Sequence, residues 1–206
     1  MQKKILTILV CMLFLTTTFS ISVYAGSEED PEIVDELPDT GVFDHLDIIS
    51  AWFFEKGDEP EYLFTALKIK EINSNRFKQH LTVHWEHNGI ECASSMNIGY
   101  YGNPWFIFSA GYGHGWWFQE HYQQIEGEYD DETGIIICKI PKNIINNPQK
   151  GDVLTNTKAL TFQRFGLIGR MGFDRFFICG LITLVTGKVP WDGAPYEYGR
   201  DYIIQY

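Results

Sequence analysis

The sequence predicts an all-β protein: an antiparallel β-sandwich of the jelly-roll-like kind, preceded by an N-terminal signal peptide. Short runs carry apolar residues at every second position, as at Leu81, Val83 and Trp85, and this alternation is the pattern of a half-buried strand. Gly, Pro, Asn and Asp separate the runs at regular spacing, and no long segment has the 3.6-residue period of a helix. Short strands divided by such turns are typical of sandwiches.

Residues 1–25 have the features of a cleavable export signal. Lys3 and Lys4 precede an uncharged, mostly apolar run, and Val23-Tyr24-Ala25 gives the small-residue pattern before Gly26, as at signal peptidase sites. We therefore expect cleavage near Ala25 and a domain that is secreted or displayed on the cell surface, with no stable membrane span after cleavage. The alternative is a membrane anchor formed by an uncleaved N-terminal segment, because length alone does not separate the two.

The next segment, residues 26–43, is an acidic lead-in interrupted by Pro31, Pro38 and Gly41. Charged residues and turn formers keep such a segment solvated. We therefore expect a flexible lead-in, followed by one β-sandwich domain over residues 44–206.

The expected strands follow in order along this domain. The first half predicts a buried strand over 46–54, a half-exposed strand over 62–72, and a hairpin of 80–86 with 90–96 around Asn88-Gly89, a dipeptide typical of tight hairpin turns. The second half predicts strands at 105–109, 116–122, 124–129, 135–140 and 152–165, and a closing strand at the C-terminal end. Residues 166–190 fit either a strand pair or a short buried helix.

Charge excludes one class of partner. The chain has 206 residues and a net charge of −11, and such a surface repels nucleic acid and anionic membranes.

An exported domain can also oxidise its cysteines. We hypothesise a Cys92–Cys138 disulfide, with buried free thiols as the alternative, because both residues lie in apolar stretches.

Glycine alternates with aromatic residues over 99–122. Sugar rings pack on exposed aromatic faces while nearby polar groups bond their hydroxyls, so this segment is a candidate ligand-binding surface. Packing in the sandwich core is the competing interpretation for each of these rings. The candidate ligand-binding residues are Tyr101, Trp105, Tyr112, Trp116 and Trp117.

Carboxylates near both ends of the domain suggest a calcium site. Asp44 and Asp47 precede the first strand, and Asp192 lies close to the C-terminal end; Asp39 and Asp201 are further members of the same acidic set. Ca²⁺ takes six to eight oxygen ligands, so these residues can bind it if the chain ends pair. The alternative is a solvated acidic surface.

The strand residues His80 and His84 are interpreted as solvent-facing rather than as metal ligands.

The order of segments resembles the DOMON domains and the family 9 carbohydrate-binding-module jelly rolls of exported archaeal and bacterial proteins. The resemblance rests on FDHLDII, on LFTALKIKEI, on LTVHWEHNGIEC and DDETGIIICKIPK, and on Asp192-Gly-Ala-Pro195. It implies a jelly-roll-like sandwich and, in some relatives, sugar, haem or calcium binding. The chain lacks a convincing Met/His pair in matching strands, so haem is not carried over.

These features favour a non-catalytic, secreted or cell-surface binding module, with a glycan as the expected ligand. A structural or interaction domain of the cell envelope is the alternative. A secreted hydrolase is a third possibility, for which Glu86, Glu91 and Glu120 are among the carboxylates available; the sequence contains no Gly-x-Ser-x-Gly nucleophile turn of the kind esterases use.

Overall fold

The computed structural model describes residues 26–35, 43–72, 78–100, 104–113, 121–164, 191–195 and 198–206. The predicted signal peptide, residues 1–25, and the segment 166–190 lie outside these ranges.

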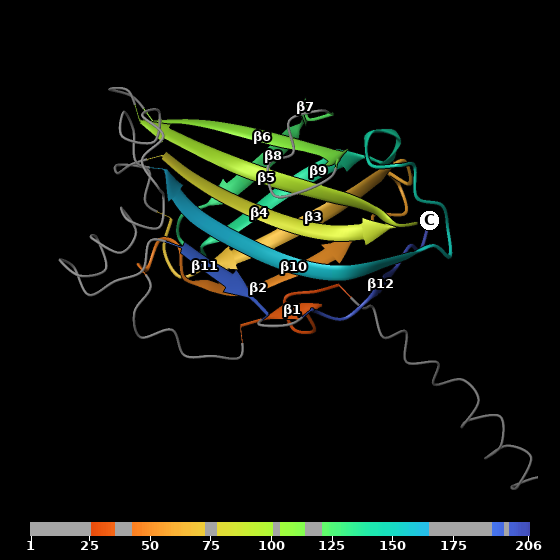
Figure 1. The fold of residues 1–206 in the computed structure, drawn as a ribbon, viewed down its shortest axis with the longest axis horizontal. Coiled ribbons are helices and arrows are strands. Elements are labelled where there is room, and N and C mark those ends of the chain that lie inside the picture. Colours follow the sequence, from red (N-terminus) through yellow and green to blue (C-terminus); the bar gives the residue numbers. More distant parts are fainter. Residues whose placement is uncertain are drawn as a thin grey trace, which may run out of the picture.

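Two antiparallel sheets face each other across one core, and the strands of one sheet cross those of the other (Figure 1). The predicted antiparallel β-sandwich is therefore confirmed. The five-stranded sheet has the order β1-β2-β3-β9-β8, with β1 at Ile33–Val34, β2 at Ile48–Phe54, β3 at Tyr62–Ile69, β9 at Ile135–Pro141 and β8 at Glu126–Asp130. A single 3₁₀ turn, η1 at Lys142–Ile144, follows β9.

The seven-stranded sheet has the order β11-β10-β4-β5-β6-β7, and β12 also pairs with β10. Its strands are β11 at Trp191–Ala194, β10 at Val153–Arg164, β4 at Lys78–His87, β5 at Ile90–Tyr100, β6 at Pro104–Gly113, β7 at Gln123–Gln124 and β12 at Tyr202–Ile203. No helix in the described ranges has the length and apolar character needed to cross a membrane.

The core forms where the inward faces of the two sheets meet. Leu81, Val83 and Trp85 of β4 are each at most 3% exposed, which confirms the inward positions predicted for them, while Thr82 and His84 on the opposite face are buried as well. Trp85 meets Phe53 of β2 edge to face, with the ring centroids 5.5 Å apart. Apolar area removed from water in this way is the main term that stabilises a fold of this size.

Part of the acidic lead-in is structured, which corrects the expectation of a flexible segment over 26–43. Ile33 and Val34 pair with Ala51 and Ser50 of β2, and Ile33 is fully buried. Further contacts from Phe53, Lys68 and Arg200 to this segment also hold residues 26–35 against the sandwich. The sandwich therefore begins in the lead-in and not at residue 44.

Chain crossings bring distant segments to one end of the sandwich. Strand β10 pairs with β4 on one side and with β11 on the other, so β11 lies close to the start of β2. The Ile48 N–H donates to Asp192 Oδ2 at 2.8 Å, and Asp192 itself is 5% exposed. The two ends of the domain therefore meet here, which is the condition under which the sequence allows the carboxylates to come together.

Candidate functional site

A polar hollow of about 100 Å³ lies on strands β4, β5 and β10. Its β4 side chains, His84 and Glu86, alternate with the core residues Val83 and Trp85, so they belong to the sheet face that points away from the core. The described side chains that surround the hollow are His84, Glu86, Glu91, Asn156, Lys158 and Tyr198.

Strand register explains why these side chains gather. Glu86 of β4 stands directly opposite Glu91 of β5, while Lys158 of β10 stands opposite His84 of β4. Because His84 and Glu86 are two residues apart on one strand, the two cross-strand rows are neighbours on the same face. The hollow therefore contains two carboxylates and one ammonium group.

A β-bulge shapes the β10 side of the hollow. The register between β10 and β4 shifts between Thr155 and Lys158, and Asn156 within the shift has a φ of 52°, a conformation that asparagine tolerates better than most residues. The bulge aims the Asn156 amide at its neighbour, so that Nδ2 donates to Glu86 Oε2 at 2.7 Å. Bulges commonly redirect a side chain in this way.

Lys158 connects the carboxylates to an exposed ring. Its Nζ lies 3.9 Å from Glu91 Oε1 and 5.9 Å from the centre of the Tyr198 ring. Tyr198 is 60% exposed, so much of its ring surface is open to a ligand. The hollow thus combines hydrogen-bond acceptors, donors and an aromatic surface within a small volume.

His84 forms a buried, uncharged part of the hollow. It is 7% exposed, which corrects the solvent-facing interpretation. Burial, with the nearby Lys158 charge, lowers the pKa of His84 to about 3, so the ring is neutral at physiological pH. Thr82 Oγ1 donates to the Leu160 carbonyl, so His84 Nε2 donates to Thr82 Oγ1 at 3.0 Å.

Of the five predicted ligand-binding aromatics, the structure places the side chain of Tyr112. It is half-buried and packs against the core, and its ring stacks on His121 with centroids 4.6 Å apart. Tyr101, Trp116 and Trp117 lie outside the described residues. Trp105 lies in β6 and pairs with Gly99, but its side chain is outside the described part of the structure.

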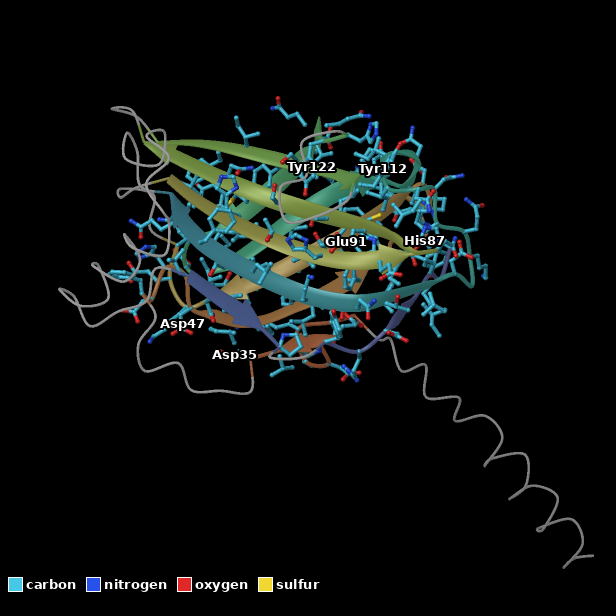
Figure 2. The ribbon with its side chains drawn as sticks, in the orientation of Figure 1. Asp35, Asp47, His87, Glu91, Tyr112 and Tyr122 are labelled. Atoms are coloured by element: carbon cyan, nitrogen blue, oxygen red, sulfur yellow. The ribbon has the colours of Figure 1, made fainter. Side chains whose placement is uncertain are left out.

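Two of the three predicted calcium ligands meet at an acidic corner. Carboxylate oxygens of Asp47 and Asp192 lie within 4.8 Å of each other and of a third residue, Asp35. Figure 2 shows Asp35 and Asp47 at the opposite end of the sandwich from Glu91 and His87. Asp44 lies beside this group and forms an ion pair with Lys70 at 2.8 Å. We define Asp35, Asp47 and Asp192 as the acidic corner.

The acidic corner is built from three segments that are far apart in sequence. Asp35 follows β1, Asp47 precedes β2, and Asp192 lies in β11. Sequence reasoning missed Asp35 because it lies in the lead-in that was expected to be flexible. Asp192 Oδ1 also accepts from the Gly193 N–H at 2.7 Å, which fixes the orientation of its carboxylate. Oxygen ligands of this kind suit a hard divalent cation such as Ca²⁺.

The structure does not join Cys92 and Cys138, which corrects the disulfide hypothesis in favour of its alternative. Both are buried free thiols among the described cysteines, and burial raises the pKa of each to about 12. Cys138 lies in β9 opposite Thr65, whereas the Cys92 thiol in β5 faces the carbonyls of Ile90 and Ile145. The two side chains therefore belong to different sheets and have different neighbours.

Comparison with known proteins adds no identity. No family model, curated protein or solved structure matches this chain.

Proposed function

We propose that this chain is a non-catalytic, exported β-sandwich binding module that takes a glycan at the polar hollow. The observation that supports it is the hollow beside Tyr198, where Glu86, Glu91 and Lys158 converge. Sites for small polar ligands are concave and contain a few convergent polar groups.

The side chains of the hollow fit the chemistry of a sugar. Hydroxyl groups can donate to the Glu86 and Glu91 carboxylates and accept from the Lys158 ammonium group. The apolar C–H face of a sugar ring can pack on Tyr198, since aromatic side chains combine an apolar surface with a defined geometry. The hollow is large enough for part of one ring, so a terminal sugar residue is the ligand that fits best.

Export forms part of the same proposal. The segment before Gly26 has the pattern of a signal peptide, and the acidic composition suits a soluble domain outside the cytoplasm. The resemblance to DOMON and family 9 carbohydrate-binding domains supports the same class of ligand.

A hydrolase is the second candidate, because Glu86 faces Glu91 directly across two strands. Glycosidases use a pair of carboxyl groups, one of which must carry a proton in order to donate it. In this hollow Asn156 donates to Glu86 and Lys158 lies close to Glu91. Each carboxylate thus lies beside a donor or a cation, an arrangement that suits a site for accepting hydrogen bonds from a ligand.

A glycan-array screen of the exported protein, with and without calcium, tests the proposal. For a glycan that binds, Glu86→Gln and Tyr198→Ala should each weaken binding by about 10-fold or more, as expected from losing a charged hydrogen-bond partner or a stacked ring. Tyr129→Ala is the matched control, because Tyr129 is a 37% exposed tyrosine on the other sheet. Trp116→Ala and Trp117→Ala test the aromatic segment separately.

Three results would contradict the proposal. Binding that Glu86→Gln and Tyr198→Ala leave unchanged would remove the hollow from the function. An array without any bound glycan would favour the structural or envelope-interaction alternative. Hydrolysis of a bound glycan that Glu86→Gln abolishes would favour the hydrolase.

A further inference from the structure

Glu32 is a buried carboxylate in the lead-in with incomplete hydrogen bonding. The residue is 3% exposed, and its Oε2 accepts from the Phe53 N–H of β2 at 2.9 Å. Within the described ranges, Oε1 is buried and has no hydrogen-bond partner. A buried carboxylate oxygen without a partner is costly, since the charge loses its hydration and gains little in return.

No side-chain cation makes a short contact with Glu32 among the described residues. The nearest basic group is Arg200, whose guanidinium binds Asp30 Oδ1 and the Pro31 carbonyl, each at 2.6 Å. Burial raises the pKa of Glu32 from 4.5 to about 7, against the lowering effects of the Phe53 N–H, its own N–H and the Arg200 charge, while Asp30 raises it further. Among the described residues, Glu32 is therefore a buried acid whose charge has no directly bound side-chain cation.

Gly26 lies against the same residue of β2. A side chain at this position would place its Cβ 1.6 Å from the Phe53 carbonyl oxygen and 3.0 Å from Tyr202 Cε2, and the Gly26 φ is +94°. Only glycine fits such a contact. Phe53 is two residues beyond Ala51, which pairs with Ile33 of β1, so both polar backbone groups of Phe53 point toward the lead-in. Glu32 meets its N–H, and Gly26 meets its carbonyl oxygen.

The same glycine follows the predicted cleavage site. Hydrolysis of the Ala25–Gly26 peptide bond consumes one water molecule, leaves a carboxylate on Ala25 and creates an α-ammonium group on Gly26. We propose that this ammonium group binds the Glu32 carboxylate, so that removal of the leader completes the docking of the lead-in on β2. The inference rests on the export part of the proposed function and is independent of the glycan.

The chemistry of the two groups is complementary. An α-amino group has an ordinary pKa of about 7.7–8.0 and is mostly protonated at neutral pH. A charge-assisted hydrogen bond at a site shielded from water is stronger than one at the surface. Before cleavage Gly26 carries a neutral amide, so Glu32 has no such partner. The pair therefore distinguishes the processed chain from its precursor.

The proposed pairing changes how the free energy of unfolding depends on pH. Without the ammonium group, the raised pKa of Glu32, about 7 against 4.5, means that the folded chain holds this proton more tightly than the unfolded chain. Its contribution is then present at low pH and falls as the pH rises from about 4.5 to 7. In the proposed pair, the positive charge of the ammonium group lowers the pKa of Glu32, so this fall in stability with rising pH becomes smaller. The other charged groups facing the site are Asp30, Arg200 and, beyond Tyr202, Glu55.

The test compares two full chains exported from the same host. One has the natural sequence, and the other carries one serine inserted between Ala25 and Gly26, which preserves the cleavage pattern and moves the ammonium group by one residue. Mass spectrometry identifies each N-terminus, and denaturant unfolding at pH 7 measures the effect of Glu32→Gln in each chain. Glu28→Gln is the matched control, since Glu28 is an exposed lead-in acid paired with Lys68.

In the natural chain, Glu32→Gln should lower the folding equilibrium constant at least tenfold, and an NMR titration should show the pKa of the Gly26 amine raised by one unit or more. In the chain with the insertion, Glu32→Gln should have no destabilising effect. Equal effects in the two chains would overturn the ammonium pairing. A processed N-terminus other than Gly26 would overturn the inference and the predicted cleavage site, and an unprocessed chain would overturn the cleavable signal peptide as well. Neither result affects the glycan test.

Discussion

The C-terminal end of the chain and its lead-in are each held to the region of β2 by a buried glutamate. Glu55, directly after β2, binds Lys142 Nζ at 2.6 Å, and its side chain is fully buried. It also accepts from the Tyr202 hydroxyl and the Gln205 N–H, while Lys142 donates to the main-chain oxygen of Tyr206. Glu32, within the electrostatic range of the same Tyr202, has backbone donors but no bound side-chain cation in the described structure.

The difference shows where each positive partner must come from. Taking a carboxylate out of water costs several kcal/mol, so a buried acid needs a cation, a set of donors or a proton. Glu55 receives its cation from η1, whereas burial raises the pKa of Glu32 toward neutrality. A fixed lysine gives a permanent clamp, and a cation formed by cleavage gives a conditional one.

The largest effect is expected from breaking the permanent clamp. Lys142→Met should lower the free energy of unfolding by about 3–5 kcal/mol, because it leaves the Glu55 charge buried and unpaired. Denaturant unfolding at pH 7 measures it. The double variant Glu55→Gln/Lys142→Met should recover much of the loss, since glutamine can still accept from Tyr202 and Gln205. Lys68→Met, at the exposed pair with Glu28, should cost less than about 1 kcal/mol. An equal loss in both single variants would contradict the comparison.

The acidic corner extends the comparison to a group of three carboxylates, one of which, Asp47, lies 3.4 Å from Lys70 Nζ. If calcium binds there, free Ca²⁺ at 100 times its dissociation constant should stabilise the protein by about 2.7 kcal/mol. Asp192→Asn should abolish this gain, measured by thermal unfolding with and without Ca²⁺. Asp44→Asn should preserve it, because Asp44 is not one of the three carboxylates that come together at the corner, although Lys70 contacts both Asp44 and Asp47. The same calcium response in Asp192→Asn would remove the corner as a calcium site.

His84 tests whether burial also disfavours the charged form of a basic group. Its pKa is lowered from 6.5 to about 3, so the unfolded chain takes up the proton first as the pH falls. Its contribution to stability is present above about pH 6.5 and is lost at about 1.4 kcal/mol per pH unit toward pH 3. His84→Gln should remove this slope from the unfolding free energy measured against pH. The exposed residue His121 provides the control His121→Gln, and a slope that survives in His84→Gln would contradict the assignment.

The smallest effect is expected at the cysteines. Cys92 and Cys138 are buried free thiols. A reducing agent should therefore leave the free energy of unfolding unchanged, because it has no disulfide between them to break. Peptide mapping of the exported protein without reduction should yield no linked Cys92–Cys138 peptide. Such a peptide would show that the sheets approach more closely at this point than in the structure described here.

Local patterns predicted the sandwich well because strand alternation is a property of neighbouring residues. The runs around Leu81 and Ile136 identify their strands, and Asn88-Gly89 identifies a turn, without reference to the rest of the chain. The sites were predicted only in part. Asp47 and Asp192 were expected to meet, but Asp35 was missed, since Ile33 and the other contacts of the lead-in carry Asp35 to the corner.

The hollow was beyond sequence reasoning for a related reason. Glu86 and Glu91 were recognisable as carboxylates near a hairpin, but their partners Asn156 and Lys158 belong to β10. Asn156 is 70 residues away from Glu86 in the sequence. Register between strands of such separation depends on which face each strand buries and on a bulge at Asn156. The local alternation indicates the buried face of one strand, but the partner strand and the position of the bulge depend on the folded chain.

By itself, the sequence determined the all-β class, the inward positions of Leu81, Val83 and Trp85, and the leader pattern that ends before Gly26. Tertiary structure alone decided that Glu32 is buried with no bound side-chain cation among the described residues, that Glu55 has one, and that His84 is neutral. The physical reason is that strand formation follows from local sterics and polarity, whereas the charge state of a buried group depends on the segments that surround it in the folded chain.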